Sequence, residues 1–413
     1  MNIFYSIMVS FVWFLSTYFN VVFLIALLTE KDEMFKYRKL NKNEDPPKVS
    51  IIVPAYNEEE TIEQSIKSLK KIDYPKDKLE IIIVNDGSRD NTGKIVNKLK
   101  GKRIIFLDNK ENRGKATSLN QGIKASTGEF VGCMDADSEV QSDIIKKTIP
   151  YFKDKKVGAV AVTVEVKNAK NFLQKIVEIE YIMGLSLALK MLSFFNAVHV
   201  TPGPFSIYRK EVLEKIGMFD PKNITEDLEI AYRIHKGGYK IACCIATKVR
   251  TITPETFKSL YRQRKRWYSG ALYTINQHRD IVLNPRIGYF SYIVPYTFLL
   301  IFFGLFLFGF SIYLGASHFA KSLSLFSLTG FNFLSYITFN EFDILTLSTL
   351  TFFGITAIAT TIFSAYVCMK LTEKVIKKKF VGFIGFIFLF FLYQIFWASS
   401  IFTVLFRKKV DWR

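Results

Sequence analysis

Long apolar stretches lie near both ends of the chain, and shorter apolar runs alternate with polar segments between them. Residues 3–28 are nearly all apolar and long enough to span a bilayer as a helix. Further spans are predicted towards the C-terminus at 289–314, 345–369 and 381–405. The pattern therefore predicts a membrane protein with a separately folded middle portion.

The number of C-terminal spans depends on residues 317–339, which are aromatic and rich in serine. Three spans place the basic cluster 374–379 inside and the cluster 407–413 outside, whereas four spans reverse this, so one cluster breaks the positive-inside rule either way. Asn332 and Asn340 weaken the fourth span. We expect three spans, with four as the alternative.

In the middle portion, continuous apolar runs rich in β-branched residues alternate with helical patterns. Buried strands are predicted at 49–54, 79–85, 103–107 and 130–134, and helices at 61–71, 90–100 and 115–125. Such runs, separated by helices, indicate a mostly parallel sheet that is covered on both faces. The expected fold class is α/β, with α-helical transmembrane segments added.

These elements divide the chain into an N-terminal anchor, a linker, an α/β domain and C-terminal transmembrane helices. The expected bounds are 1–30, 31–48, 49–285 and 286–413. No basic region precedes the anchor and no clear small-residue cleavage site follows it, so a retained anchor is favoured over a cleaved signal. The basic residues after the anchor place its C-terminal end, and the α/β domain, in the cytoplasm.

The formal net charge of +19 could suit a nucleic-acid partner. Much of the Lys and Arg lies beside apolar spans, however, so the positive-inside bias explains the charge better, and we expect no nucleic acid. An anionic nucleotide substrate and acidic lipid headgroups would also suit it. The four cysteines and four histidines show no metal-ligand spacing, which indicates reduced, structural thiols.

Two segments after the predicted strands are open to more than one interpretation. Residues 171–195 form a long helical pattern that is too short in its apolar part to span, so it is either an interfacial helix or a core helix. In Thr201-Pro202-Gly203-Pro204-Phe205-Ser206, a glycine between two prolines either lines a channel with backbone groups or forms a stiff turn.

Asp135 and Asp137 stand where the last predicted strand ends, with only Ala136 between them. In an open α/β sheet, ligands bind beyond this edge. Paired acids there suit a divalent cation that carries substrate phosphates. A solvated acidic loop is the alternative, because an isolated D-x-D is common.

Other polar loops should meet at the same edge: Pro54 to Glu58, Asn85 to Ser88 and Asn112 to Lys115. An aspartate there can accept hydrogen bonds from a base or ribose, and a lysine at a glycine-led helix start can meet a pyrophosphate. Neither a P-loop nor a G-x-G-x-x-G fingerprint is present.

Two later motifs carry further candidate chemistry. Thr225 reads as a helix N-cap followed by the acids Glu226 and Asp227, which is also their ordinary structural explanation. In YRQRKRWYSG (261–270), Trp267 could stack on a sugar or base and Arg266 could hold a phosphate. A basic amphipathic helix at the membrane surface explains the same stretch.

The order of these motifs resembles that of the processive, membrane-bound family-2 glycosyltransferases, which include cellulose, chitin, hyaluronan and poly-N-acetylglucosamine synthases. The motifs are Asp86, then Asp135-Ala136-Asp137, then Thr225-Glu226-Asp227, then Gln263-Arg264-Lys265-Arg266-Trp267. The short anchor and compact size look most like the poly-β-1,6-N-acetylglucosamine synthase type. Gly203-Pro204 departs from the expected Gly-Ala and leans towards the chitin and hyaluronan branch.

The resemblance implies a GT-A type domain that binds a UDP-sugar and a metal, Mg²⁺ or Mn²⁺. It implies catalytic roles for Asp227, as general base, and Glu226. Donor-binding roles would fall to Pro54, Tyr56, Glu58, Asp86, Lys115, Asp135, Gln263 and Arg266. Acceptor-binding roles would fall to Trp267, Gly203 and Thr225, and metal-binding roles to Asp137 and Asp135.

The implied activity is inverting transfer of a sugar, N-acetylglucosamine by the closest resemblance, to a growing β-linked polysaccharide that the protein helps to export. The implied partners are the donor, the polysaccharide acceptor, the lipid bilayer and a small accessory membrane subunit, in a multi-pass protein of the cell membrane. The alternatives are a transferase that adds one sugar to a polyprenyl phosphate, and a transport or scaffold protein with an inactive transferase domain. The Q-x-x-R-W motif favours polymerisation over the first, and the intact acids argue against the second.

Overall fold

The computed structural model describes residues 3–29, 45–328 and 380–406, together with 355–356, 359–360, 362–363 and 366. The chain divides into two compact units. The larger unit comprises Thr29–Pro295 and Cys368–Arg413, and the smaller unit comprises Met1–Leu28 and Tyr296–Val367.

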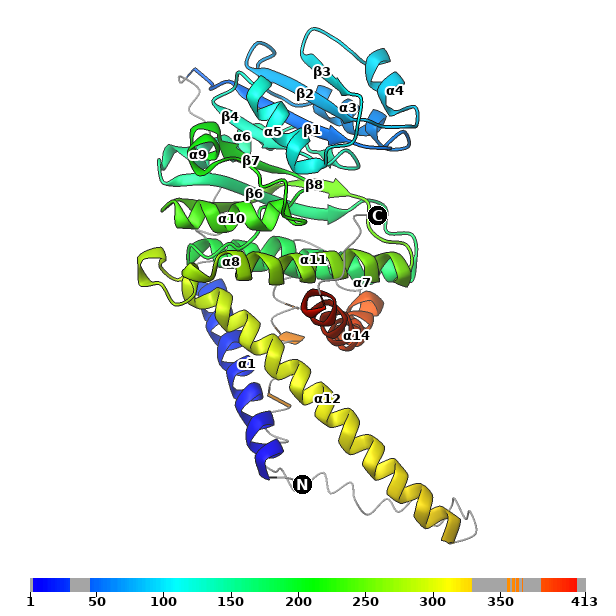
Figure 1. Ribbon diagram of the computed structural model, residues 1–413. Coiled ribbons are helices and arrows are strands. Elements are labelled where there is room, and N and C mark those ends of the chain that lie inside the picture. The colour runs from blue at the N-terminus through cyan, green and yellow to red at the C-terminus, as the bar shows by residue number, and fades with distance from the viewer. Residues whose placement is uncertain are drawn as a thin grey trace. The chain divides into compact units, whose positions relative to one another are not determined.

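The first half of the larger unit follows the predicted alternation of strands and helices (Figure 1). Its strands are β1 (Val49–Ala55), β2 (Leu79–Asp86), β3 (Ile104–Asn109) and β4 (Phe130–Cys133), and its helices are α3 (Ile62–Lys70), α4 (Thr92–Lys98) and α5 (Lys115–Ala125). The strands pair in parallel in the order β3-β2-β1-β4. Val49 of β1 is opposite Leu79 of β2 and Phe130 of β4.

Every residue of β1 is buried, including Ser50, as its largely apolar run predicts. Alternate side chains enter different cores: Ile51 packs in the same cluster as Ile66 of α3, and Ile52 in the same cluster as Leu119 of α5. Because successive residues of a strand point to opposite faces, this division confirms that the sheet is covered on both sides.

The second half of the sheet is mixed, and the sheet as a whole remains mostly parallel, as expected. Its strands are β5 (Glu139–Val140), β6 (Val157–Val166), β7 (Ser206–Arg209) and β8 (Lys240–Thr251). The full order is β3-β2-β1-β4-β7-β6-β8-β5. Strand β7 runs antiparallel to both β4 and β6, and β5 is antiparallel to β8, whereas β6 and β8 are parallel.

Helices and single turns lie between and after the strands of this half in the chain. They are α6 (Ile144–Thr148), η1 (Ile149–Lys153), α7 (Phe172–Tyr181), η2 (Ile182–Ala188), α8 (Leu189–Phe194), α9 (Lys210–Ile216), α10 (Glu226–Lys236), α11 (Phe257–Gln277), η3 (Arg279–Ile281) and η4 (Pro285–Ile287). The predicted helix at 171–195 is present as the consecutive segments α7, η2 and α8. Ile176 and Val177 lie in the domain core, so one side of this helix is a core surface, whereas Phe172 is exposed.

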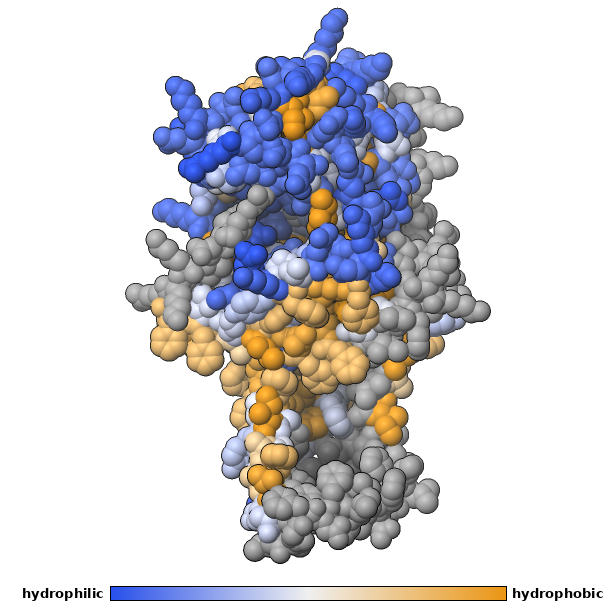
Figure 2. All heavy atoms as spheres, turned by 90° about the vertical axis from the view of Figure 1, so that its right-hand side faces the viewer, coloured by the Kyte–Doolittle hydropathy of each residue, from blue (hydrophilic) through white to orange (hydrophobic). Residues whose placement is uncertain are grey.

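The C-terminal helix α14 (Phe380–Leu405) packs against α7 and α11 of the same unit (Figure 1). Leu389 and Phe396 belong to the core cluster of the domain, whereas Phe388 and Phe402 on α14 are exposed. In Figure 2, hydrophobic side chains gather at the level of α14, and the surface over the sheet is hydrophilic. The predicted span at 381–405 is thus a helix with one side seated on the α/β domain.

The smaller unit contains α1 (Ile3–Thr29) and most of α12 (Phe290–Leu328). Among the described residues, one stretch, Phe290–Lys321, is long and apolar enough to cross a membrane. Helix α12 continues beyond the predicted end of the span at residue 314. Several predicted features lie outside the described residues. They are residues 31–44 of the linker, most of the predicted span 345–369 with Cys368, and both C-terminal basic clusters.

Candidate active site

The loops after β1 and β2 meet at the C-terminal edge of the parallel strands, as predicted. The backbone N–H of Asn57 donates to Ser88 Oγ at 2.9 Å, and the N–H of Glu58 donates to Thr92 Oγ1 at 2.8 Å. These bonds bring the segment with Tyr56 and Glu58 beside the segment with Asp86. Pro54 lies one step further back, inside β1 and opposite Val84.

Asp86 is buried at the end of β2, and the backbone amides that begin α5 use both of its carboxylate oxygens. The N–H of Arg113 donates to Oδ1 at 3.0 Å, and the N–H of Gly114 donates to Oδ2 at 2.9 Å. Gly114 precedes the helix with φ of +88°, a conformation that favours glycine. Asp86 therefore fixes the position from which Lys115 extends.

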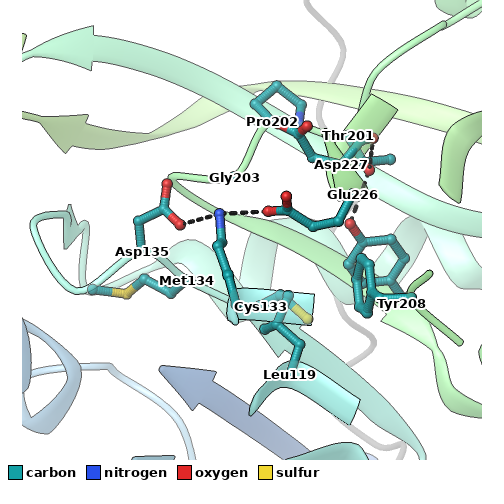
Figure 3. A pocket seen from close by; sticks show the side chains of 12 residues that line it. Leu119, Cys133, Met134, Asp135, Thr201, Pro202, Gly203, Tyr208, Glu226 and Asp227 are labelled. Atoms are coloured by element: carbon teal, nitrogen blue, oxygen red, sulfur yellow. Dashed lines mark hydrogen bonds and ion pairs between the residues drawn. The ribbon is translucent and has the colours of Figure 1, made fainter. Parts of the chain in front are cut away.

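Lys115 joins the two acidic motifs (Figure 3). Its Nζ lies 2.6 Å from Asp135 Oδ1 and 2.7 Å from Glu226 Oε1. Figure 3 shows Asp135 and Glu226 pointing towards each other, with dashed lines from both to the ammonium between them. Burial alone would lower the pKa of Lys115, but Asp135 and Glu226 raise it well above its ordinary value, so the lysine stays charged.

The pKa values of Glu226 and Asp227, the first residues of α10, are shifted in opposite directions. Burial disfavours the charged form of Glu226, yet its ion pair with Lys115 holds its pKa below the ordinary value. Burial and the charge of Glu226 raise the pKa of Asp227 to about 6, and the charges of Lys115 and Arg266 oppose this rise. Two neighbouring carboxylates with separated pKa values suit different roles, and the higher one suits a general base.

A series of hydrogen bonds that starts on β7 holds the backbone of Asp227. Thr201 donates to the carbonyl oxygen of Asp227 from its N–H at 3.0 Å and from Oγ1 at 2.8 Å. The hydroxyl of Tyr208 on β7 donates in turn to Thr201 Oγ1 at 2.9 Å. Sequence reasoning missed Tyr208. The one feature of the sequence that could have indicated its burial is its place in the short apolar run after the Pro-Gly-Pro segment.

Gly203 lies directly against the ion pair of Lys115 and Asp135. A Cβ atom at this position would lie 2.9 Å from Lys115 Nζ and 2.9 Å from Asp135 Oδ2. The loop therefore touches the centre of the site through its backbone, which no larger residue could do without displacing these side chains. Of the two sequence interpretations, the observed contact favours a loop that lines the site.

Asp137 is the second acid of the D-x-D motif. Its Oδ1 accepts hydrogen bonds from Ser138 Oγ at 3.0 Å and Thr251 Oγ1 at 3.2 Å. Burial and the nearby charges of Asp135 and Glu58 raise its pKa to about 6. The charges of Asp135 and Glu58 thus act on Asp137, and the convergence of the two motif acids on one metal stays a prediction.

No cluster of three or more His, Cys, Asp or Glu side chains that could hold a metal by itself occurs in the described part of the chain. The paired acids Asp135 and Asp137 are nevertheless a fitting donor set for Mg²⁺. That ion retains waters and binds through one or two carboxylates together with substrate phosphates. The mutual repulsion of the two carboxylates is the feature that a cation would relieve.

Helix α11 carries the Gln263 to Trp267 motif beside α10. Gly270 makes the close contact between the helices, because a Cβ atom there would lie 2.3 Å from Thr225 Oγ1. Thr225 occupies the predicted N-cap position of α10, but its hydroxyl donates to Asn223 Oδ1 and makes no cap bond. Arg266 acts electrostatically on Glu226 and Asp227, as expected for a residue of the same site.

Five of the predicted site residues line one small cavity of about 10 Å³. They are Lys115, Asp135, Gly203, Glu226 and Asp227. The volume is about that of one water molecule. The other predicted residues do not line this cavity, and Gln263 and Trp267 among them lie on α11. The roles of all the predicted site residues stay predictions.

Sequence reasoning missed Arg264, whose side chain is fully buried on α11. A basic stretch suggests exposure, but Arg264 falls four residues after buried Leu260 and so lies on the same helix face. The three cysteines among the described residues, Cys133, Cys243 and Cys244, are buried and unpaired, as predicted.

Relatives and a solved structure resemble this chain over different ranges. Poly-beta-1,6-N-acetyl-D-glucosamine synthase of Staphylococcus aureus (strain COL) is 34% identical over 270 residues, 65% of this chain and 65% of that protein. The synthase of the same name from Staphylococcus epidermidis is 33% identical over 273 residues, 65% of this chain and 64% of that protein. The match thus spans 65% of the length of the Staphylococcus aureus relative.

A solved structure shares the fold. Mannosyltransferase PcManGT from Pyrobaculum calidifontis, in complex with GDP-Man and Mn²⁺, superposes with a TM-score of 0.57 at 20% identity, over 86% of this chain and 98% of that chain. Residues 50–217 match glycosyl transferase family 2. This range holds β1 to β4, Asp86, Lys115 and both acids of the D-x-D motif. The chain is therefore similar to glycosyl transferase family 2 over residues 50–217.

Proposed function

We propose that this protein transfers N-acetylglucosamine from a UDP-sugar to the end of a growing β-linked polysaccharide, with inversion at the anomeric carbon. The observation that carries the proposal is the cluster around Lys115. Its ammonium joins Asp135 after β4 to Glu226 at the start of α10, next to Asp227 with its raised pKa of about 6. Acids from the donor edge and a base from a second element are thereby held within one site.

The proposed reaction assigns each proton and electron pair. An acceptor hydroxyl gives its proton to the Asp227 carboxylate, and its oxygen forms a bond to the anomeric carbon. The bond between that carbon and the diphosphate oxygen breaks on the opposite face, and UDP leaves with the electron pair. Lys115 and Arg266 stabilise the negative charge that develops on the diphosphate. Attack opposite the leaving group turns an α-linked donor into a β-linked product.

Asp135 and Asp137 are the residues that would hold Mg²⁺ or Mn²⁺ against the diphosphate. When bound, the ion supplies Lewis-acid neutralisation of the leaving group. Asp86, Tyr56 and Glu58 would contact the uridine and ribose side from the loops after β1 and β2.

The names of the relatives support the choice of sugar and of polymer. Synthases that are 34% and 33% identical carry the name poly-beta-1,6-N-acetyl-D-glucosamine synthase. The apolar stretch Phe290–Lys321 supports a membrane location, and the exposed aromatic side of α14 supports contact with lipid. We therefore extend the proposal to a multi-pass protein of the cell membrane with a cytoplasmic catalytic domain that helps to export its product.

Radiolabel incorporation by purified protein in detergent or vesicles tests the proposal. UDP-N-acetylglucosamine, UDP-glucose and UDP-glucuronate are offered separately and in pairs, with Mg²⁺ or Mn²⁺, and Asp227→Asn is the matched inactive control. High-mass product from N-acetylglucosamine alone supports the proposal, and selective glycanases then identify the linkage. Product that requires a mixed pair, a single sugar on lipid, or no product with any donor would each contradict it.

A further inference from the structure

The buried guanidinium of Arg264 connects three helices that are far apart in the sequence. On α11, Arg264 is 0% exposed, and its Nη2 lies 2.6 Å from Glu180 Oε2 on α7. The same carboxylate oxygen accepts a hydrogen bond from the hydroxyl of Tyr393 on α14 at 2.6 Å. Figure 1 shows α7, α11 and α14 next to one another.

A fully buried charge of this kind restricts geometry. A guanidinium out of water is stable only where a carboxylate and further hydrogen bonds compensate for its lost hydration. Glu180 is the acid paired with Arg264, and Tyr393 in turn holds Glu180. The position of α11 is therefore coupled to the position of α14 through one carboxylate.

The guanidinium of Arg264 also contacts two other residues of the motif, Gln263 and Trp267. The Arg264 carbon Cζ lies 4.2 Å from the centre of the Trp267 ring, a cation–π distance. The Arg264 Nη1 also donates to Gln263 Oε1. The side chain that binds Glu180 thus orients the Trp267 ring, for which the family resemblance implies an acceptor-binding role.

Further contacts on either side of Tyr393 hold α14 against α11 and α7. Tyr268 stacks on Trp397, with ring centres 4.1 Å apart and planes 7° apart. The hydroxyl of Tyr261 bonds to the hydroxyl of Ser399. Helix α14 also packs closely on α7, because a Cβ atom at Gly385 of α14 would lie 2.5 Å from Cδ1 of Ile176 on α7.

We propose that Glu180, Arg264 and Tyr393 are positioning residues that hold Trp267 in the geometry needed for the polysaccharide acceptor. The inference rests on the proposed function and deepens it. It gives the apolar C-terminal helix α14 a part in acceptor use, in addition to any part in membrane attachment.

The variant Tyr393→Phe tests the inference, because it removes one hydroxyl and keeps the ring that packs against Phe396 and Tyr268. We expect the KM for a short β-linked N-acetylglucosamine oligosaccharide to rise about three- to tenfold, the range for the net loss of one ordinary hydrogen bond. The rate of UDP-N-acetylglucosamine hydrolysis without acceptor, and the KM for the donor, should stay at wild-type values.

The control is Tyr273→Phe, which removes a hydroxyl on α11 for which the described residues provide no hydrogen-bond partner. It should leave both KM values unchanged. A second variant, Arg264→Lys, keeps a charge for Glu180 and loses the planar contact with Trp267, so it should raise the acceptor KM more than Tyr393→Phe.

The outcomes separate this inference from the proposed function. Wild-type protein that elongates the oligosaccharide, with an unchanged acceptor KM in Tyr393→Phe, overturns the inference alone. Equal loss of elongation and donor hydrolysis in that variant also overturns it, since a general packing defect would act on both. Wild-type protein that transfers no sugar from any donor removes the proposed function and this inference with it.

Discussion

Adding one methyl group at Gly270 should reduce catalytic activity much more than the stability of the fold. A Cβ atom on Gly270 would lie 2.3 Å from Oγ1, 2.4 Å from Cγ2 and 2.8 Å from Cβ of Thr225. Rotation of the Thr225 side chain can move Oγ1 and Cγ2 but cannot move Cβ. Gly270→Ala therefore forces α11 away from the first turn of α10, which carries Glu226 and Asp227.

The magnitude follows from the contact distances. Carbon atoms pack best at about 3.5–4.0 Å, so relief of the closest Cβ contact needs a shift of about 1 Å. Overpacking costs about 1–3 kcal/mol, and alanine in place of a helical glycine returns about 1 kcal/mol. The free energy of unfolding should thus fall by about 0–2 kcal/mol, which lowers Tm by at most roughly 8 °C. A misplacement of about 1 Å can reduce catalysis about 100-fold.

Thermal unfolding and radiolabel incorporation, measured on the same preparations, check this prediction. Gly184→Ala is the matched control, because a Cβ atom at Gly184 meets no atom within 4 Å. We expect the control to keep wild-type activity and Gly270→Ala to lose about 100-fold while remaining folded. Turnover of Gly270→Ala within about threefold of wild type would refute the argument that a shift of this size disturbs the site.

Three further results are expected. Because the base must be a carboxylate and the pKa of Asp227 is raised to about 6, kcat/KM should fall as pH decreases through about 6 and level off above it; a profile without this limb would exclude Asp227 as the base. Trp267→Ala should reduce polymer elongation more than donor hydrolysis, and equal loss of both would argue against an acceptor platform. Chelation of divalent cations should abolish transfer, and Mn²⁺ should raise the Tm of wild-type protein but not of Asp137→Asn; the same rise in both would place the cation elsewhere.

The parallel half of the fold could be predicted because its signals are local. After Ser50 in β1 and Glu80 in β2, each strand is an apolar run rich in β-branched residues, and each is followed by a helix. The second half lacks such signals. Strand β7 has four residues, and β8 mixes exposed and buried positions, so their pairing depends on contacts between distant segments.

The candidate site was predictable in its residue types and not in its internal pairing. Their positions at the predicted ends of strands and helices identified Asp135, Glu226 and Lys115 as candidates in three separate motifs. That Lys115 would bridge the other two depends on how β4, α5 and α10 converge, which no local pattern encodes. The burial of Arg264 was hidden for a related reason, since its compensating acid, Glu180, lies 84 residues away.

The charges at the centre of the site explain why these pairings matter together. Lys115 and Arg266 bring two positive charges close to Asp135, Asp137, Glu226 and Asp227, so the acids outnumber the bases when all are ionised. Lys115 forms ion pairs with both Asp135 and Glu226. The pKa values of Asp137 and Asp227 are each raised to about 6. A cation near Asp137 would relieve the first of these, and an acceptor proton would relieve the second. The two perturbed acids therefore mark the two places where the proposed reaction needs a positive partner: the diphosphate side and the acceptor side.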